Sequence, residues 1–131
     1  MKIQNNKHDS SVSELMEIQS HKGIYTIEFD DACIERFGEW DFDTTHFIVD
    51  RKVAQLYLEQ LQPILEAPSV LQLDALETNK SLEKLPGFVE FLVDKRIRRN
   101  HTLVAIGGGI MQDITSFLAA TLFRGVEWIF F

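Results

Sequence analysis

The feature that most constrains the fold of this chain is the alternation of short apolar runs with helical patterns after residue 45. Apolar runs predict strands at residues 46–50, 70–73, 102–106 and 126–131, and apolar positions at helical spacing predict helices at residues 51–65, 81–97 and 110–123. Strands alternating with helices are typical of a parallel sheet with helices packed on its faces. We therefore expect an α/β fold for this part of the chain.

Before residue 46 the pattern is different. Residues 1–13 are polar and are expected to be disordered or irregular, whereas residues 14–20 and 23–30 alternate and predict two strands of a hairpin. A short helix is expected over residues 31–40, with Asp30 or Asp31 as its N-cap. Because 131 residues suit one domain, we expect residues 14–131 to form a single α/β domain.

Charge and composition argue against several functional classes. The formal net charge is −7, which is unsuited to nucleic acid or to an anionic membrane surface. Residues 117–131 form the longest apolar stretch, but Arg124 and Glu127 interrupt it and a membrane span needs roughly 20 apolar residues. Residues 1–13 lack the apolar core of a signal peptide, and Cys33 is a single cysteine, so we expect a cytoplasmic protein without disulfides.

One local exception to the acidic charge is a run of cations at Lys95, Arg96, Arg98 and Arg99. The helix predicted at residues 81–97 ends within this run. We expect the cations to complement the partial negative charge at the C-terminal end of that helix. Pro86 and Gly87 interrupt the same helical pattern, so the helix either kinks there or begins its main body there.

Gly107, Gly108 and Gly109 stand between the predicted strand at 102–106 and the helix at 110–123. Glycines at this place let a ligand approach the backbone, and the free N–H groups that open a helix attract an anion such as a pyrophosphate. A tight structural turn would use the same residues. The spacing and order differ from the ordinary G-x-G-x-x-G fingerprint, in which an acid follows the glycines.

Two acids are candidates for contacts with a polar ligand. Asp50 closes a predicted strand and suits ribose hydroxyls, although locally an N-cap for the following helix is the simpler interpretation. Asp113 lies one turn into the helix after the glycines, where it either benefits from the helix dipole or reaches a ligand beside the loop.

Together these residues resemble a known family. The segment Gly107-Gly108-Gly109-Ile110-Met111-Gln112-Asp113, followed by Phe117, Ala119-Ala120-Thr121 and Arg124-Gly125, resembles the G-G-G-x-x-x-D…F-x-A-A-T-x-x-R-G stretch of 3-dehydroquinate synthases. Upstream, Glu77-Thr78-Asn79-Lys80-Ser81 resembles the E-x-x-K-S motif of that family. The resemblance covers residues 46–131 and implies a Rossmann-like parallel sheet with flanking helices, as in the N-terminal domain of the dehydroquinate synthase-like fold.

The resemblance also implies roles for individual residues. The three glycines would hold the pyrophosphate of NAD, and Asp113 would lie near its nicotinamide half. The adenosine side would be contacted by Asp50, Glu77 and Lys80. Arg124 would contribute to the phosphate site of the substrate, a task that suits the planar guanidinium. The alternative for Arg124 is a cation at a helix C-terminus.

In this family NAD is used and regenerated within one turnover: a substrate hydroxyl is transiently oxidised, phosphate is eliminated, the hydride returns and a carbocycle forms. A divalent metal, usually zinc, is held by one glutamate and two histidines of a helical C-terminal domain. We expect that domain to lie outside these 131 residues, because His8, His21, His46 and His101 match no ligand spacing and are interpreted as surface or strand-end residues. The resemblance implies a sugar phosphate substrate and a homodimer for the full-length protein, and an inactive chain when these residues stand alone.

The sequence departs from the family pattern at Lys52, Leu76, Gln112 and Ser116, where an asparagine and three glycines are usual. The particular product therefore stays open among 3-dehydroquinate, 2-deoxy-scyllo-inosose and valiolone-type rings. Two alternatives remain, a stand-alone nucleotide-binding α/β module and a domain similar to iron-dependent alcohol dehydrogenases. The Glu77/Lys80 pair and Arg124-Gly125 favour the cyclase.

Overall fold

The computed structural model describes residues 14–21, 23–30, 32–33 and 40–131. The chain divides into two compact units, Met1–Arg36 and Phe37–Phe131. The division falls inside the range 14–131 that the sequence predicts as one domain, and each unit is described by itself below. Residues 1–13 and most of the helix expected at 31–40 lie outside the described residues.

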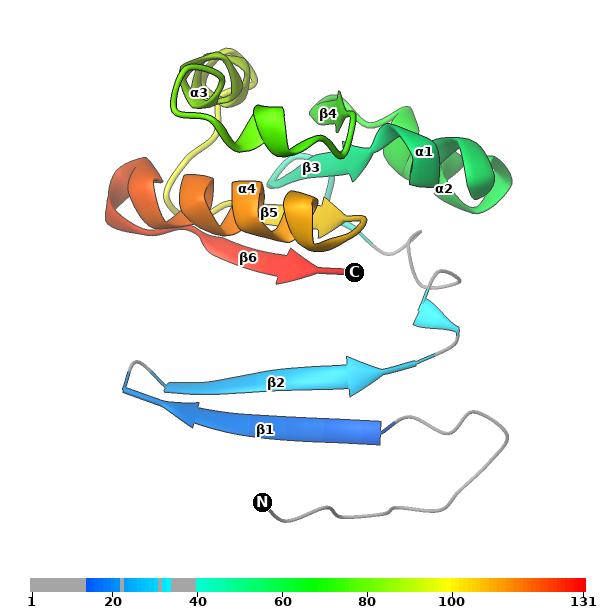
Figure 1. The fold of residues 1–131 in the computed structure, drawn as a ribbon, viewed down its shortest axis with the longest axis vertical. Helices are drawn as coiled ribbons and strands as arrows, with labels where there is room; N and C mark the ends of the chain where they lie inside the picture. The colour runs from blue at the N-terminus through cyan, green and yellow to red at the C-terminus, as the bar shows by residue number, and fades with distance from the viewer. Residues whose placement is uncertain (1–13, 22, 31, 34–39) are drawn as a thin grey trace. The chain divides into compact units, whose positions relative to one another are not determined.

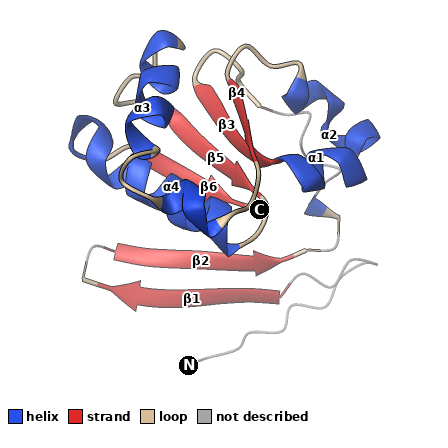
Figure 2. Ribbon diagram, turned by 45° about the horizontal axis from the view of Figure 1, so that its top comes forward, coloured by secondary structure: helices blue, strands red, loops and turns tan. Residues whose placement is uncertain are grey.

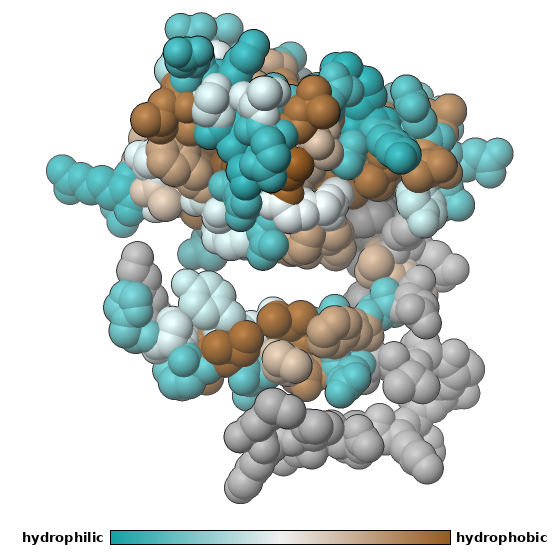
Figure 3. All heavy atoms as spheres, viewed as in Figure 1, coloured by the Kyte–Doolittle hydropathy of each residue, from teal (hydrophilic) through white to brown (hydrophobic). Residues whose placement is uncertain are grey.

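The first unit contains an antiparallel hairpin of β1 (Glu14–Ser20) and β2 (Gly23–Phe29), at the position the sequence predicts (Figure 1). Ser20 pairs with Gly23, whose φ of 140° suits a glycine, and the Ser20 hydroxyl donates to the Gly23 carbonyl at 3.0 Å. The register places Met16, Ile18, Tyr25, Ile27 and Phe29 on one face. Figure 3 shows apolar side chains gathered along this hairpin.

The second unit holds a four-stranded parallel sheet in the order β4-β3-β5-β6, with helices around it (Figures 1 and 2). This confirms the predicted α/β class. In chain order its elements are β3 (Thr45–Asp50), α1 (Arg51–Leu56), α2 (Leu58–Leu65), β4 (Val70–Leu73), the 3-10 helix η2 (Glu77–Lys80), α3 (Leu85–Asp94), β5 (Thr102–Ile106), α4 (Gly109–Thr121), the 3-10 helix η3 (Leu122–Arg124) and β6 (Glu127–Phe130).

Strand β3 has a neighbouring strand on each side, and the chain reaches the two neighbours one after the other. The chain passes from β3 to β4 on one side and then returns to place β5 on the other side of β3. Because parallel crossovers are right-handed, this change of direction puts α1 and α2 on one face of the sheet and α3 and α4 on the other. The carboxyl ends of β3 and β5 therefore flank the point where the strand order reverses.

The core on the face of α3 and α4 joins strand and helix residues that are almost completely buried. Ile48 and Leu103 of the sheet belong to one cluster with Leu92 of α3 and Ile114 and Leu118 of α4. Every residue of β3 is buried, as expected of a central parallel strand.

Among the described residues no helix is both long and apolar enough to cross a membrane.

Two predicted helices differ in extent. The helix predicted at 51–65 is divided into α1 and α2 at Tyr57, whose backbone angles, φ −119° and ψ 37°, are not helical. Leu56, next to this break, is exposed. The helix predicted at 81–97 begins at Leu85, with Pro86 in its first turn, where the missing N–H costs no hydrogen bond. Its main body therefore begins at the proline, one of the two expected possibilities.

The end of α3 is a Schellman motif, a helix stop in which two N–H groups close back onto the last turn. The Arg96 N–H donates to the Val93 carbonyl at 2.8 Å, and the Ile97 N–H donates to the Leu92 carbonyl at 3.0 Å. The motif requires a left-handed residue, and Arg96 takes that conformation with φ 60°. Glycine is usual there because a side chain costs roughly 1–2 kcal/mol in this region.

A buried chain of hydrogen bonds joins the amino ends of three neighbouring strands. The Ser69 hydroxyl, just before β4, lies 2.7 Å from His46 Nδ1, and His46 Nε2 lies 2.8 Å from His101 Nδ1, just before β5. His46 is 2% and His101 8% exposed, so both are strand-end residues as expected but neither is a surface residue. Burial, reinforced by the neighbouring His101, lowers the pKa of His46 to about 4.

We predict that Arg96→Gly stabilises the chain, because glycine removes the strain of a left-handed side chain while leaving the backbone bonds in place. The expected gain is about 1 kcal/mol in the free energy of unfolding, measured by urea denaturation. Lys95→Gly is the matched control, since Lys95 has φ −81° and gains nothing from glycine. Equal or lower stability of Arg96→Gly would contradict the strain.

The burial of His46 predicts that the stability of the chain is sensitive to acid. An unfolded histidine titrates near 6.5, whereas folded His46 titrates at about 4, so between these values the unfolded state binds more protons. The free energy of unfolding should therefore fall with decreasing pH across this window, by at most about 1.4 kcal/mol per pH unit from this group. Urea denaturation at several pH values should show a shallower slope in His46→Gln, and identical slopes would exclude His46 as the source.

Candidate functional site

The candidate site lies at the carboxyl ends of β3 and β5. Asp50 is the last residue of β3, and Gly107 follows the last residue of β5, the strand paired with β3. The strand order reverses between these two strands. In open α/β sheets this is where a crevice forms and ligands bind.

Both the backbone conformation and the lack of room for a side chain require glycine at position 107. Its φ is 149°, and a Cβ built on it would lie 2.8 Å from Asp50 Cβ and 2.8 Å from Met111 Cγ. Its N–H donates to the Phe131 carbonyl at 2.9 Å, which ties the loop to the segment after β6. Only glycine allows β3, β5 and the start of α4 to approach this closely.

Gly108 and Gly109 face open space instead. Gly108 is the N-cap of α4, and a Cβ on either glycine would meet nothing within 4 Å. Within the described part of the chain, the N–H groups of Gly108, Gly109 and Ile110 make no hydrogen bond, whereas the Met111 N–H already donates to the Gly108 carbonyl. Free N–H groups at the positive end of a 13-residue helix suit an anion.

Asp50 caps α1, which is the simpler of its two predicted roles. Its Oδ1 accepts the Lys52 N–H at 2.9 Å, and the residue is 8% exposed. The cap uses one carboxylate oxygen, and a carboxylate offers two. Capping and a contact with a ligand hydroxyl are therefore compatible at this residue.

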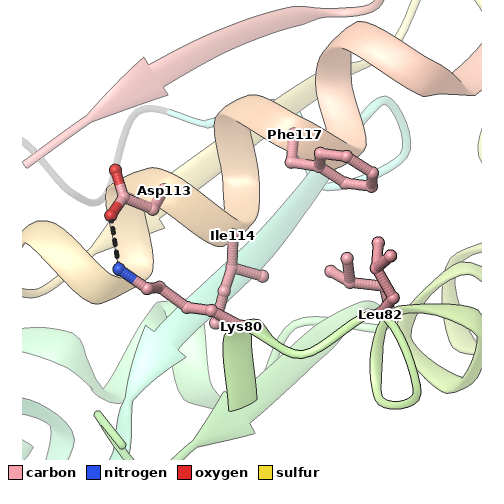
Figure 4. Close-up of a pocket in the computed structure, with 6 residues that line it drawn as sticks. Lys80, Leu82, Asp113, Ile114 and Phe117 are labelled. Atoms are coloured by element: carbon pink, nitrogen blue, oxygen red, sulfur yellow. Dashed lines mark hydrogen bonds and ion pairs between the residues drawn. The ribbon is translucent and has the colours of Figure 1, made fainter. Parts of the chain in front are cut away.

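A three-residue ionic cluster lies beside the loop. Lys80 of η2 reaches across to α4, with Nζ 3.0 Å from Asp113 Oδ2 (Figure 4). The same Nζ lies 3.0 Å from Glu77 Oε2. The hydrogen bond to Asp113, and then that to Glu77, raise the pKa of the Lys80 ammonium above its ordinary value. The structure thus brings Glu77, Lys80 and Asp113 together, although they come from separate parts of the sequence.

A pocket of about 210 Å³ adjoins this cluster. Its polar end is the Lys80–Asp113 pair, and its apolar wall consists of Leu82, Leu85, Ile114 and Phe117 (Figure 4). Leu82 is 75% and Phe117 43% exposed, although both are apolar residues within the helical patterns predicted at 81–97 and 110–123. The face of α4 that packs on the sheet carries Met111, Ile114, Thr115, Leu118 and Ala119, and Phe117 lies outside this set. Sequence reasoning therefore missed Leu82 and Phe117 as pocket residues.

Arg124 lies apart from these groups. It follows the C-terminal end of α4, and 13 helical residues at about 1.5 Å each put roughly 20 Å between that end and the glycine loop. Phe123 and Arg124 both have left-handed backbones, with φ 49° and 66°. Within one chain, Arg124 and the glycine loop therefore lie at opposite ends of α4.

No metal centre is formed by the part of the chain that the structure describes: no group of three or more His, Cys, Asp or Glu residues is placed to hold an ion. His46 and His101, the buried pair, are hydrogen-bonded to each other and lie at the amino ends of the strands.

Comparisons with known proteins agree on the family. Residues 70–131 match the family model described as 3-dehydroquinate synthase N-terminal. The 3-dehydroquinate synthase of Staphylococcus haemolyticus is 35% identical over 109 residues, covering 80% of this chain and 31% of that protein. The enzyme of the same name from Staphylococcus carnosus is 36% identical over 89 residues, covering 63% of this chain and 25% of that protein.

A solved structure of 2-deoxy-scyllo-inosose synthase has the same fold, with a TM-score of 0.68 and 18% sequence identity, and covers 88% of this chain and 35% of that one. The same synthase complexed with carbaglucose-6-phosphate, NAD+ and Co2+ also gives a TM-score of 0.68. The chain spans about a third of the length of the relatives first named here. The family model, the similar sequences and the fold together show that the chain belongs to the 3-dehydroquinate synthase-like family. Residues 70–131 correspond to the N-terminal region of that family.

Proposed function

We propose that the chain is the NAD-binding half of a 3-dehydroquinate synthase-like cyclase. The observation that carries this proposal is the set of free N–H groups at Gly108, Gly109 and Ile110, located where the strand order reverses. A pyrophosphate fits such a group because it accepts several hydrogen bonds and is stabilised by the helix dipole. The lack of any Cβ on Gly108 and Gly109 leaves room for it.

The side chains around the loop fit the remaining parts of the cofactor. The second carboxylate oxygen of Asp50 suits a ribose hydroxyl, and Glu77 and Lys80 provide an acceptor and a donor for the adenosine side. Asp113, on the first turns of α4, is proposed to face the nicotinamide half. When bound, NAD supplies the reversible oxidation of a substrate hydroxyl. The chain itself positions the dinucleotide.

The activity of the whole protein is proposed to be NAD- and metal-dependent phosphate elimination from a sugar phosphate, with formation of a carbocycle, in a homodimer. The names of the similar proteins support the proposed reaction, cofactor and metal: a 3-dehydroquinate synthase, and a 2-deoxy-scyllo-inosose synthase in complex with carbaglucose-6-phosphate, NAD+ and Co2+. Zinc or another divalent metal would serve the full-length protein. Because the chain spans about a third of these relatives, we propose that it binds nucleotide but does not turn over substrate alone.

Arg124 keeps its proposed role in binding the substrate phosphate. Since α4 separates it from the glycine loop, that phosphate lies at a different place from the NAD pyrophosphate bound by the same chain. The planar guanidinium suits bidentate contact with phosphate oxygens.

We predict that NAD binds to the chain and that Gly108→Val weakens this binding without unfolding the chain. A Cβ at Gly108 has no neighbour within 4 Å and φ is negative, so valine is accommodated but covers the N–H groups. Isothermal titration calorimetry of NAD should show at least about a tenfold loss of affinity, as expected when charge-assisted hydrogen bonds are lost.

Gly87→Val is the matched control, because Gly87 also faces open space but lies in α3 away from the loop. It should bind NAD as the parent does. Equal binding by both variants would contradict the glycine loop as the site. No binding by a parent that circular dichroism shows to be folded would contradict NAD binding by this chain.

A further inference from the structure

A second charged surface lies at the opposite, amino edge of the sheet. Lys95, Arg96, Arg98 and Arg99 lie between α3 and β5, and all four are exposed. We call these four residues the arginine turn. Among the described residues, no carboxylate forms an ion pair with any of them. Four unpaired cations within five positions are a strong local contrast to a net charge of −7.

The arginine turn has a fixed backbone. Ile97, in its middle, is 4% exposed and belongs to the core cluster, and its N–H donates to the Leu92 carbonyl at 3.0 Å. The His101 N–H donates to the Arg98 carbonyl at 3.0 Å just before β5 begins. The cations therefore project from a rigid turn, and little backbone entropy is lost when a partner binds.

The helix-dipole role expected for these cations is compatible with their place just after α3, but it does not require a left-handed Arg96, since Lys95 supplies a cation there at φ −81°. The last turn of α3 carries no basic residue, and α3 ends at Asp94, before the arginines. Arg96 takes the left-handed position that glycine would fill at lower cost. A side chain kept at a strained position is evidence of a use for that side chain.

The acids on the same edge are few and partly occupied. Asp41, before β3, accepts the Thr44 hydroxyl at 2.9 Å through Oδ2 and the Asp43 N–H at 3.1 Å through Oδ1. Glu127 begins β6 and pairs in register with Thr102 of β5, and Asp94 ends α3. None of these carboxylates lies within ion-pair distance of the arginine turn.

We propose that the arginine turn docks an acidic segment of a partner protein. Three of its four cations are guanidinium groups, whose planar fork matches carboxylates in two-point contacts. Lys95 is directed elsewhere, with Nζ 5.7 Å from the centre of the Phe91 ring. A short acidic protein segment fits better than nucleic acid, because a few carboxylates cover the arginine turn alone, whereas an extended nucleic acid would also meet the rest of the chain, which is strongly acidic. This surface is separate from the proposed NAD site.

The test uses a fluorescent octaglutamate peptide and the intact chain, with affinity measured by fluorescence anisotropy at low ionic strength. Arg96→Gly should weaken binding about tenfold, the loss expected for one charge-assisted contact, while raising thermal stability. Loss of binding together with a gain in stability separates a recognition role from a structural one. Lys52→Gln is the matched control, because it removes an exposed cation at the other edge of the sheet, and it should bind within about twofold of the parent.

Arg98→Gln combined with Arg99→Gln provides a second variant that leaves the left-handed residue unchanged, and it should weaken binding further. Equal affinities of the parent, Arg96→Gly and this double variant would overturn the proposal. Tighter binding of a single-stranded oligonucleotide of the same charge than of octaglutamate would also overturn it, since the surface would then select phosphates.

Discussion

The close approach of the Gly107 backbone to Asp50 and Met111 is the contact on which the rest of the site depends. A Cβ there would lie 2.8 Å from two neighbouring side-chain atoms, so any other residue would push β3, β5 and α4 apart. Because the approach is tight, α4 begins directly at the carboxyl edge of the sheet. The free N–H groups of its first turn are thereby presented where the strand order reverses.

The two edges of the sheet have different chemistry. The carboxyl edge carries the glycine loop, the capped Asp50 and the Lys80 cluster, all oriented for a polar ligand. The amino edge carries the buried Ser69–His46–His101 chain, the arginine turn and Arg124. α4 connects the edges, with the glycine loop at one end and Arg124 at the other, so the family motif spans the whole depth of the sheet.

Much of the sheet could be predicted because a buried parallel strand is a continuous apolar run. Strands at 70–73 and 102–106 have the same bounds in the structure, and the hairpin also lies where alternation places it. Helix ends were harder. The predicted end at residue 97 was wrong because the helix stops through a left-handed arginine, and the usual glycine signal is missing from the sequence.

From the sequence, site residues could be predicted only where they belong to a recognisable motif. The glycine loop and Asp50 follow directly from strand ends, whereas the Lys80–Asp113 pair joins residues 33 positions apart. The His46–His101 contact joins residues 55 positions apart and has no local signal. Leu82 and Phe117 both belong to apolar helical patterns of the sequence. Leu82 is exposed because α3 begins only at Leu85, and Phe117 is exposed because helical spacing does not fix how far a helix is rotated against a sheet.

The claim that the opening turn of α4 holds a dinucleotide can be tested directly by amide chemical shifts. NAD added to the ¹⁵N-labelled chain should shift the amide signals of Gly108, Gly109 and Ile110 most, because their N–H groups have no other partner. The signals of the arginine turn should stay unchanged at the opposite edge. Shifts confined to that edge, or a titration that leaves the three loop amides unchanged, would contradict the claim.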